Sequence, residues 1–228
     1  MRRRLALCGL IVVVGCHAAE DQTPISAVPP PDVAAAVSAP PVAVLPAWRF
    51  IEVDGAVSID GAPAARDQVI KPTSTIDVGA ESSALITLGA KSIIEVREKT
   101  KLTLGASPRK KISAHLRAGQ LWNFFGGATD YEVVTDNAVA GVRGTVFYVN
   151  AEDPKVTLVC ACSRGVHLES LDPKKPSSHL VEAKEWEHIG TAFVRKGKQV
   201  GKKKMGKIAD PPNHPNARGK ELLARMPE

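Results

Sequence analysis

Aromatic residues are scarce in this chain of 228 residues, since phenylalanine, tryptophan and tyrosine together make up 4% of it. All of them fall between Trp48 and Phe193. Because large apolar side chains supply most of a hydrophobic core, we expect a core only within this window. The segments before and after it lack the bulk that a packed domain needs.

The chain also lacks an apolar run long enough to cross a bilayer. The run at residues 5–14 has about ten residues, whereas a membrane-spanning helix needs about 20. It follows three arginines, as in a bacterial secretory signal, and the Val-Val-Gly-Cys motif that ends at Cys16 resembles a lipobox. We therefore predict a cleaved lipoprotein signal peptide over residues 1–15 and lipid attachment at Cys16.

The stretch at residues 16–47 is predicted to be the lipidated cysteine and a disordered tether. Its positions 17–46 hold seven prolines, eight alanines and no aromatic residue, a composition that neither buries a core nor holds a helix. Two or more acyl chains give stable membrane anchoring, and His17 after the cysteine favours sorting to the outer membrane. We thus expect a lipid-anchored protein of the bacterial cell envelope, at the outer membrane and facing the periplasm.

Charge is concentrated at the C-terminal end. The chain has a net charge of +6, and residues 194–228 hold ten basic and three acidic side chains. With four prolines and no aromatic residue, this segment is predicted to be a basic, mostly disordered tail attracted to anionic envelope surfaces. Nucleic acid is not an expected partner, because export separates the protein from it and the tail has no stacking aromatic residue.

Motifs of common enzyme classes are missing. The sequence has no G-x-S-x-G elbow, no phosphate-binding glycine loop, no H-E-x-x-H helix and no EF-hand loop. His188 is the one histidine weighed as a general base, and a lone histidine of this kind is expected to be solvated. We predict a protein that is not an enzyme and that needs no cofactor.

The aromatic window has the pattern of an all-β domain. Short apolar alternations of period two are separated by glycine or proline signals, and no stretch has a helical apolar face. The candidate strands, nine or ten in all, include residues 57–59, 84–88, 93–96, 142–149, 156–162 and 166–170. We predict a single jelly-roll-like β-sandwich domain over residues 48–193.

One glycine-flanked arginine stands out within this window, in Arg143-Gly144-Thr145-Val146-Phe147. A glycine here permits a bulge or a close backbone approach, and the arginine has five donors suited to loop carbonyls. We therefore interpret this motif in the first place as a structural one, in which Arg143 holds a corner of the fold. Contact with a ligand is the second interpretation.

This motif and several neighbouring stretches resemble the FecR-type periplasmic domain. The similar stretches are residues 50–57, 83–92, 116–121, 135–149 and 163–168, within a resemblance that covers about residues 48–190. The resemblance implies a glycine-punctuated β-sandwich, which in regulators of iron uptake receives a signal in the periplasm. Those regulators place a cytoplasmic module and a membrane helix before the domain, where this chain has a signal and a tether. We therefore expect sensing, binding or scaffolding, and not control of a sigma factor.

The two remaining cysteines form a Cys-x-Cys pair in a predicted strand. Cys160 and Cys162 point to one face, which we expect to be the core face. Three interpretations stay open: buried free thiols, a strained disulfide, and a soft-metal or redox site. The spacing differs from ordinary zinc motifs, so no metal is the first expectation. The metal alternative would be completed by His167, His179 or His188, with His188 preferred because His167 is expected to face water.

Taken together, the sequence predicts a membrane-anchored envelope lipoprotein whose FecR-like domain is a non-catalytic binding, sensing or scaffold module. Its partner would be an envelope protein or a cell-wall component. The alternative is a metal-binding or thiol-redox lipoprotein that uses Cys160 and Cys162.

Overall fold

The computed structural model describes residues 47–89, 91–106, 112–126, 130–174, 176–196, 199–208 and 211–226. The chain divides into two compact units, Met1–Ala43 and Val44–Glu228, and every described residue lies in the second. The predicted signal peptide, Cys16 and nearly all of the predicted tether lie outside the described residues.

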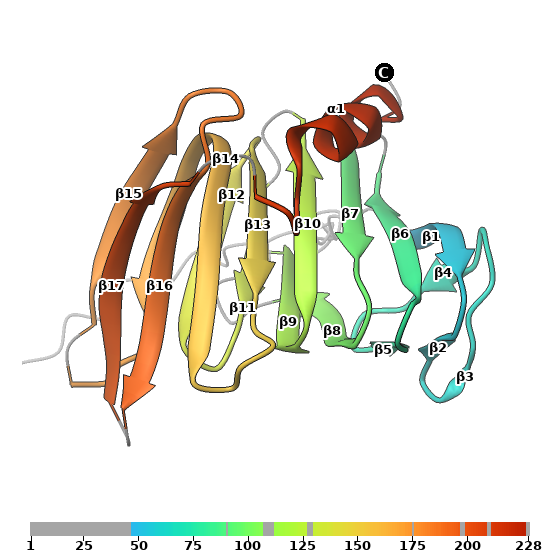
Figure 1. The fold of residues 1–228 in the computed structure, drawn as a ribbon. Helices are drawn as coiled ribbons and strands as arrows, with labels where there is room; N and C mark the ends of the chain where they lie inside the picture. The colour runs from blue at the N-terminus through green and yellow to red at the C-terminus, as the bar shows by residue number, and fades with distance from the viewer. Residues whose placement is uncertain are drawn as a thin grey trace, which may run out of the picture. The chain divides into compact units, whose positions relative to one another are not determined.

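The described part of the second unit consists of β-strands and one short helix, which confirms the prediction of an all-β fold (Figure 1). The elements are β1 (Trp48–Asp54), β2 (Val57–Ile59), β3 (Ala62–Pro63), β4 (Val69–Ile70), β5 (Thr75–Val78), β6 (Ser83–Leu88), β7 (Ser92–Val96), β8 (Thr100–Ala106), β9 (Ile112–Ala118), β10 (Gln120–Phe125), β11 (Asp130–Val134), β12 (Ala138–Arg143), β13 (Val146–Asn150), β14 (Val156–Ser170), β15 (Ser178–Ala183), β16 (Ile189–Lys196), β17 (Gln199–Lys207) and α1 (Asn216–Ala224). Within the described ranges, no helix is long and apolar enough to span a membrane.

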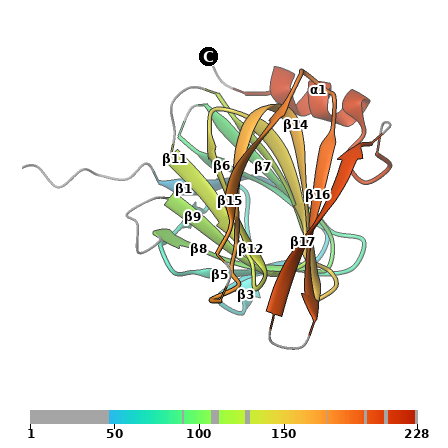
Figure 2. The same ribbon diagram turned by 90° about the vertical axis from the view of Figure 1, so that its left-hand side faces the viewer.

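The strands form two curved sheets that face each other (Figure 2). Sheet A has the order β4-β1-β6-β7-β10-β13-β14-β16-β17. Sheet B has the order β3-β2-β5-β8-β9-β11-β12-β14-β15. Strand β14 belongs to both sheets, because its first half pairs in sheet A and its second half in sheet B. The narrower expectation of a jelly roll is not confirmed, since β9 and β11 pair in parallel whereas jelly rolls are antiparallel.

Local sequence signals explain the hairpins. Strands β2 and β3 are joined through Asp60 and Gly61, which have φ values of +51° and +80°. Two consecutive positive φ values define the tight turn that Asp-Gly favours, and its twist matches that of the strands. The predicted hairpin between β6 and β7 is also present.

Two apolar clusters hold the unit together. The main core lies between the sheets and contains Phe50, Ile86, Tyr131 and Phe147, each with no exposed side-chain surface. A second, smaller core lies on the opposite face of sheet A, where its members are Leu85, Ile93, Trp122, Phe124, Val146, Tyr148, Cys160, Cys162 and Leu222. Sheet A is therefore buried on both faces around β10, in which every residue is buried.

The predicted disordered tail is wrong for the described part of residues 194–228. Strand β16 continues to Lys196, β17 pairs with it along its whole length, and α1 follows. The β-domain thus extends well past the predicted boundary at residue 193. Composition misled the prediction because β17 is the outermost strand of sheet A, where lysines are a normal protection against pairing with another chain.

The predicted single strand over residues 142–149 is also wrong, because the chain changes sheets within it. Strand β12 ends in sheet B at Arg143, Gly144 adopts a φ of +71°, and β13 begins in sheet A at Val146. A residue in the left-handed region ends the regular strand. The arginine-glycine motif therefore marks a corner between the two sheets.

We expect Gly119→Ala to destabilise the domain severely. Gly119 has a φ of +94°, and a Cβ there would overlap the Cα and Oγ1 atoms of Thr100. Gly61→Ala is the matched control, because Gly61 also has a positive φ but faces open space. The control should lose only the left-handed penalty of about 1–2 kcal/mol. Urea unfolding measures both variants, and equal losses would contradict the predicted overlap.

Candidate functional site

Four buried side chains with metal-ligating atoms meet on the outer face of sheet A. They are Cys160, Cys162, His188 and His214, hereafter the Cys/His cluster, and their ligand atoms all lie within 4.8 Å of one another. The exposed fractions are 0% for both cysteines, 1% for His188 and 2% for His214. Four such groups without solvent contact form a closed site and not a surface patch.

Strand β14 positions the two thiols. Val159 and Ala161 belong to the main core, whereas Cys160 and Cys162 belong to the second core. The pairing with β13 slips between Ala161 and Ser163, so that Cys162 is the extra residue of a β-bulge. The predicted shared face is correct, and it is a core face as expected, although it belongs to the second core and not to the main one. Both cysteines are free, so the disulfide alternative is not what the structure contains.

His188 is buried, which corrects the expectation of a solvated histidine. It lies just before β16, and its Nδ1 atom is 3.7 Å from the sulfur of Cys160. Its Nε2 atom is 2.8 Å from Oδ1 of Asn216, the first residue of α1. An amide oxygen only accepts hydrogen bonds, so Nε2 carries the proton and Nδ1 presents its lone pair to the cluster.

His214 is the member of the cluster that sequence reasoning missed. Its ring stacks on Tyr148 at a centroid distance of 4.0 Å and meets the ring of His188 edge-on at 5.1 Å. Neither of its ring nitrogens has a hydrogen-bond partner among the described residues. The one available signal was its place between two prolines, Pro212 and Pro215, which predicts a fixed turn.

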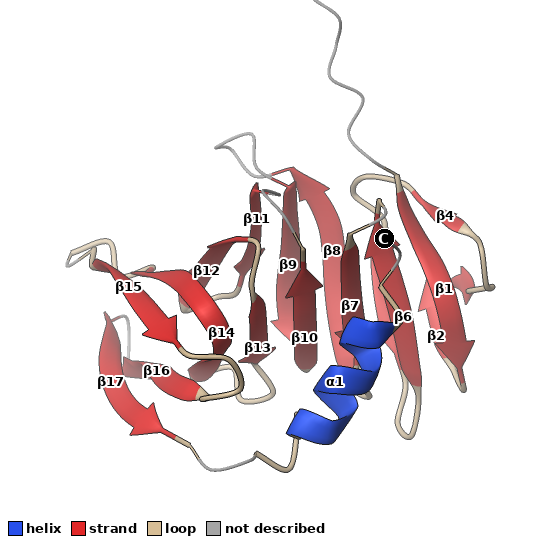
Figure 3. Ribbon diagram, turned by 90° about the horizontal axis from the view of Figure 1, so that it is seen from above, coloured by secondary structure: helices blue, strands red, loops and turns tan. Residues whose placement is uncertain are grey.

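The segment at residues 211–226, hereafter the C-terminal segment, brings His214 to the cluster and covers the second core (Figure 3). Strand β7 and the residue that follows it hold this segment at two points. The guanidinium of Arg97 donates to the carbonyl oxygen of Asn213 at 2.6 Å, and Arg218 contacts the buried carboxylate of Glu95 through Nε and Nη2, both at 3.0 Å. The cluster is therefore complete only while the segment is docked.

The cluster distributes protons unequally between its thiols. The hydrogen bond with the Cys162 thiol lowers the pKa of Cys160, and His188 and His214 act in the same direction. Burial raises the pKa of Cys162, and the neighbouring Cys160 adds to that effect. Burial also lowers the pKa of His214. The arrangement therefore favours a thiolate at Cys160 and a neutral imidazole at His214, and both groups can donate an electron pair.

The structure brings together the three residues of the predicted metal alternative, Cys160, Cys162 and His188. His167 is exposed on β14, as predicted, and is not part of the cluster. His179 is not part of it either. Two cysteines and two histidines are a common ligand set of metal ions with tetrahedral coordination.

The arginine-glycine motif lies at the corner between the sheets. The hydroxyl of Thr145 donates to the carbonyl oxygen of Ser163, and Arg164 donates to that of Gly144 at 3.3 Å. Phe147 is fully buried in the main core. These bonds connect the β12–β13 corner to the bend of β14. The predicted role of Arg143 stays a prediction, because its side chain lies outside what the structure describes.

A cavity of about 400 Å³ opens at this corner. Its lining includes Gly144, Thr145 and Arg164, together with Leu223 from the C-terminal segment. Leu223 is 38% exposed. The cavity is thus accessible, in contrast to the closed Cys/His cluster.

Fold and site together define a two-sheet β-domain with an accessible corner and a closed Cys/His cluster. The model of the FecR protein family matches residues 74–164, from the end of the loop before β5 to the bend of β14. This part of the β-domain is therefore similar to the FecR family.

Two solved structures of an anti-sigma factor candidate from Parabacteroides distasonis ATCC 8503 are similar to this chain. Each has 16% sequence identity and a TM-score of 0.43, and the match covers 57% of this chain and 59% of the other. The chain thus matches somewhat more than half the length of these structures. No curated protein matches.

We expect Gly219→Ala to loosen the C-terminal segment. A Cβ at Gly219 would lie 2.5 Å from Cζ3 of Trp186 and 2.7 Å from Cζ2 of Trp122. Overpacking costs about 1–3 kcal/mol, so alkylation of Cys160 and Cys162 in the reduced, metal-free protein should speed up roughly five- to hundredfold.

The matched control is Lys220→Ala, because Lys220 is the next helix residue and is exposed. Both changes improve helix propensity, so only the contact with the rings separates them. Mass spectrometry of the alkylated protein measures the rates. Equal rates in the two variants would show that Gly219 does not govern docking.

Proposed function

We propose that this protein is a lipid-anchored envelope protein whose FecR-like domain binds or senses a partner without catalysis. The match to the FecR family supports the sensing role, and the signal-like N-terminus with Cys16 supports the anchor. The resemblance to FecR-type domains favours the periplasm as the compartment. A tether of about 30 residues at about 3.1 Å each holds the domain up to roughly 90 Å from the lipid.

The accessible corner is the observation that carries the binding role. The most family-specific residues of the sequence, from Arg143 to Phe147, run through this corner, and a cavity opens beside it. Concave surfaces with a few fixed polar groups are the usual ligand sites of proteins. The exposed Leu223 at its rim supplies an apolar contact for a protein or cell-wall partner.

A non-catalytic role is supported by the placement of the strongest nucleophile. The thiol of Cys160 is fully buried together with His188. A nucleophile and its base must reach a substrate to act, and this pair is covered by the C-terminal segment. The buried cluster therefore suits storage of an ion or a structural role better than turnover.

The second candidate function is metal binding or thiol redox chemistry, which the Cys/His cluster favours. It predicts that changing both cysteines to serine abolishes metal or redox behaviour. Partner binding at the corner, by contrast, should be weakened at most and not abolished by that change.

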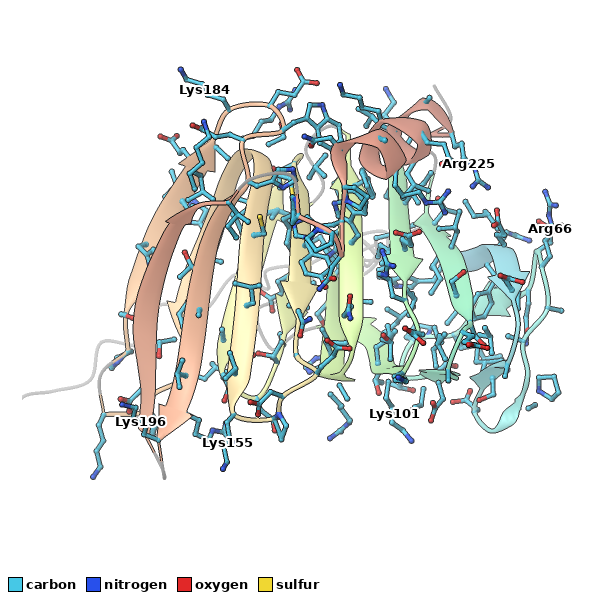
Figure 4. The ribbon with its side chains drawn as sticks, viewed as in Figure 1. Arg66, Lys101, Lys155, Lys184, Lys196 and Arg225 are labelled. Carbon is cyan, nitrogen blue, oxygen red and sulfur yellow. The ribbon has the colours of Figure 1, made fainter. Side chains whose placement is uncertain are left out.

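Basic residues favour an anionic envelope surface as a further contact. Lys155 and Lys196 are exposed and project from the same end of the strands (Figure 4), and the sequence of β17 includes three consecutive lysines. Each basic residue close to an anionic surface contributes about 1 kcal/mol. We propose that the end of the domain that carries Lys155 and Lys196 stays near phospholipid or lipopolysaccharide headgroups.

Cys16→Ser should move the protein from the membrane fraction to the soluble fraction, because it removes the predicted site of the acyl chains. Cys8→Ser is the matched control, since Cys8 lies in the predicted signal peptide. The control should remain in the membrane fraction. Fractionation followed by immunoblotting measures both, and retention of the Cys16→Ser protein in the membrane would contradict the lipid anchor.

Leu223→Asp should reduce crosslinking to the partner in the membrane fraction several-fold, because a carboxylate at the cavity rim disfavours an apolar contact. Leu171→Asp is the matched control, since Leu171 is 40% exposed and does not line the cavity. Quantitative mass spectrometry of crosslinked species gives the yields. If both variants lose the same amount, or neither loses any, the corner is not the binding surface.

A further inference from the structure

We propose that Cys160, Cys162, His188 and His214 bind one zinc ion, and that this ion fixes the C-terminal segment on sheet A. This site is the Cys/His cluster of the second candidate function, on which the proposal rests, and it is distinct from the corner. Its four ligand groups come from three separate parts of the chain.

The separation of the ligand atoms fits a tetrahedral ion. Zinc binds sulfur at about 2.3 Å and nitrogen at about 2.0–2.1 Å, so its ligand atoms lie roughly 3.4–3.8 Å apart in a tetrahedron. The sulfur of Cys160 and Nδ1 of His188 are already 3.7 Å apart. All four atoms lie within 4.8 Å of one another, so side-chain shifts of about 1 Å complete the tetrahedron.

The ring nitrogens of His214 are the independent observation that points to an ion. The residue is 2% exposed and neither nitrogen has a hydrogen-bond partner among the described residues. An unsatisfied buried polar group costs about 1–3 kcal/mol. A metal ion at the cluster lowers this cost, because it accepts the lone pair of one nitrogen and leaves only the N–H of the other without a partner.

His188 is held as metal-ligating histidines usually are. Its Nε2–H donates to Oδ1 of Asn216, which fixes the ring and leaves Nδ1 for the ion. The backbone of His188 has a φ of +55°, a conformation that costs an ordinary residue about 1–3 kcal/mol. Because it fixes the ring of His188, Asn216 is a positioning residue of the site.

Charge balance favours zinc over copper(I). Two thiolates and two neutral imidazoles carry a charge of −2, which Zn²⁺ cancels and Cu⁺ leaves at −1. A site with exposed fractions of 2% or less disfavours an uncompensated charge. The closed set of four ligands is typical of structural zinc sites.

The ion joins sheet A to the C-terminal segment, which is far from β14 in the sequence. Cys160 and Cys162 lie in β14 and His188 precedes β16, whereas His214 belongs to the C-terminal segment. A ligand that binds only the docked state stabilises it in proportion to its saturation. Zinc therefore controls how long the segment stays on sheet A.

The first test is zinc binding by the full, reduced chain in detergent after removal of metal with a chelator. We expect one Zn²⁺ per chain by native mass spectrometry, and the visible bands of tetrahedral cobalt when Co²⁺ replaces zinc. Cys162→Ser and His214→Gln should weaken zinc binding at least about 100-fold, and Asn216→Ala about 10–100-fold. Competition with a chromophoric chelator measures the affinities.

His167→Gln is the matched control, because His167 is exposed on the same strand as the two cysteines. It should bind zinc as the unchanged protein does. Absence of stoichiometric binding by the reduced protein would overturn the proposal, as would unchanged binding in His214→Gln. Circular dichroism checks the fold of each variant, and zinc should also protect both thiols of the unchanged protein from alkylation.

The second test is tryptic cleavage within the C-terminal segment, at Arg218 and the exposed Lys220. At a free zinc concentration of 100 times the dissociation constant, we expect cleavage to slow up to about 100-fold. His214→Gln should show no protection. Zinc binding without protection from trypsin would overturn the proposed link between the ion and the docked segment. If the unchanged protein binds no zinc while Leu223→Asp still reduces crosslinking to the partner, only the zinc proposal is refuted.

Discussion

Burial of both faces of sheet A is the constraint on which the rest of the structure depends. Strand β10 directs Leu121 and Phe125 into the main core, and Trp122 and Phe124 into the second core. An antiparallel sheet commonly leaves one face to water. In this protein the outer face of sheet A carries the large rings of Trp122 and Phe124 instead. A third layer is required to keep them dry, and the C-terminal segment is that layer.

Polar contacts decide where the third layer lies. The carboxylate of Glu95 is buried in β7, and the guanidinium of Arg218 is its partner at 3.0 Å. Undocking of the segment breaks this ion pair as well as the apolar contacts of the second core. The bond from Arg97 to the carbonyl of Asn213 fixes the turn next to His214. These polar contacts thus fix the position at which His214 reaches the Cys/His cluster.

Local patterns predicted much of the fold, because hairpins depend on nearby residues. The Asp60-Gly61 turn, the hairpin between β6 and β7, and the outward direction of His167 all follow from period two and turn chemistry. The break at Gly144 was missed because apolar residues continue on both sides of it. Only the change of sheet separates β12 from β13, and that is a tertiary feature.

The C-terminal segment was mispredicted because its stability comes from outside its own sequence. Helix α1 has few apolar residues, and it is held by Trp122, Trp186 and Glu95. A signal for a covering layer did exist in β7 and β10, whose nearly continuous apolar residues are typical of strands buried on both faces. His214 lies 52 positions after Cys162, so no local spacing joins them.

The same segment contributes to both candidate sites, and this links them energetically. His214 enters the Cys/His cluster near the start of the segment, and Leu223 lines the corner cavity near its end. Two sites coupled through one docked element influence each other only by the difference in affinity that each ligand has for the docked and undocked states. A zinc ion requires the docked state, because it needs His214. A partner at the corner that contacts Leu223 requires it too, so zinc strengthens the binding of that partner and the partner strengthens the binding of zinc by the same factor.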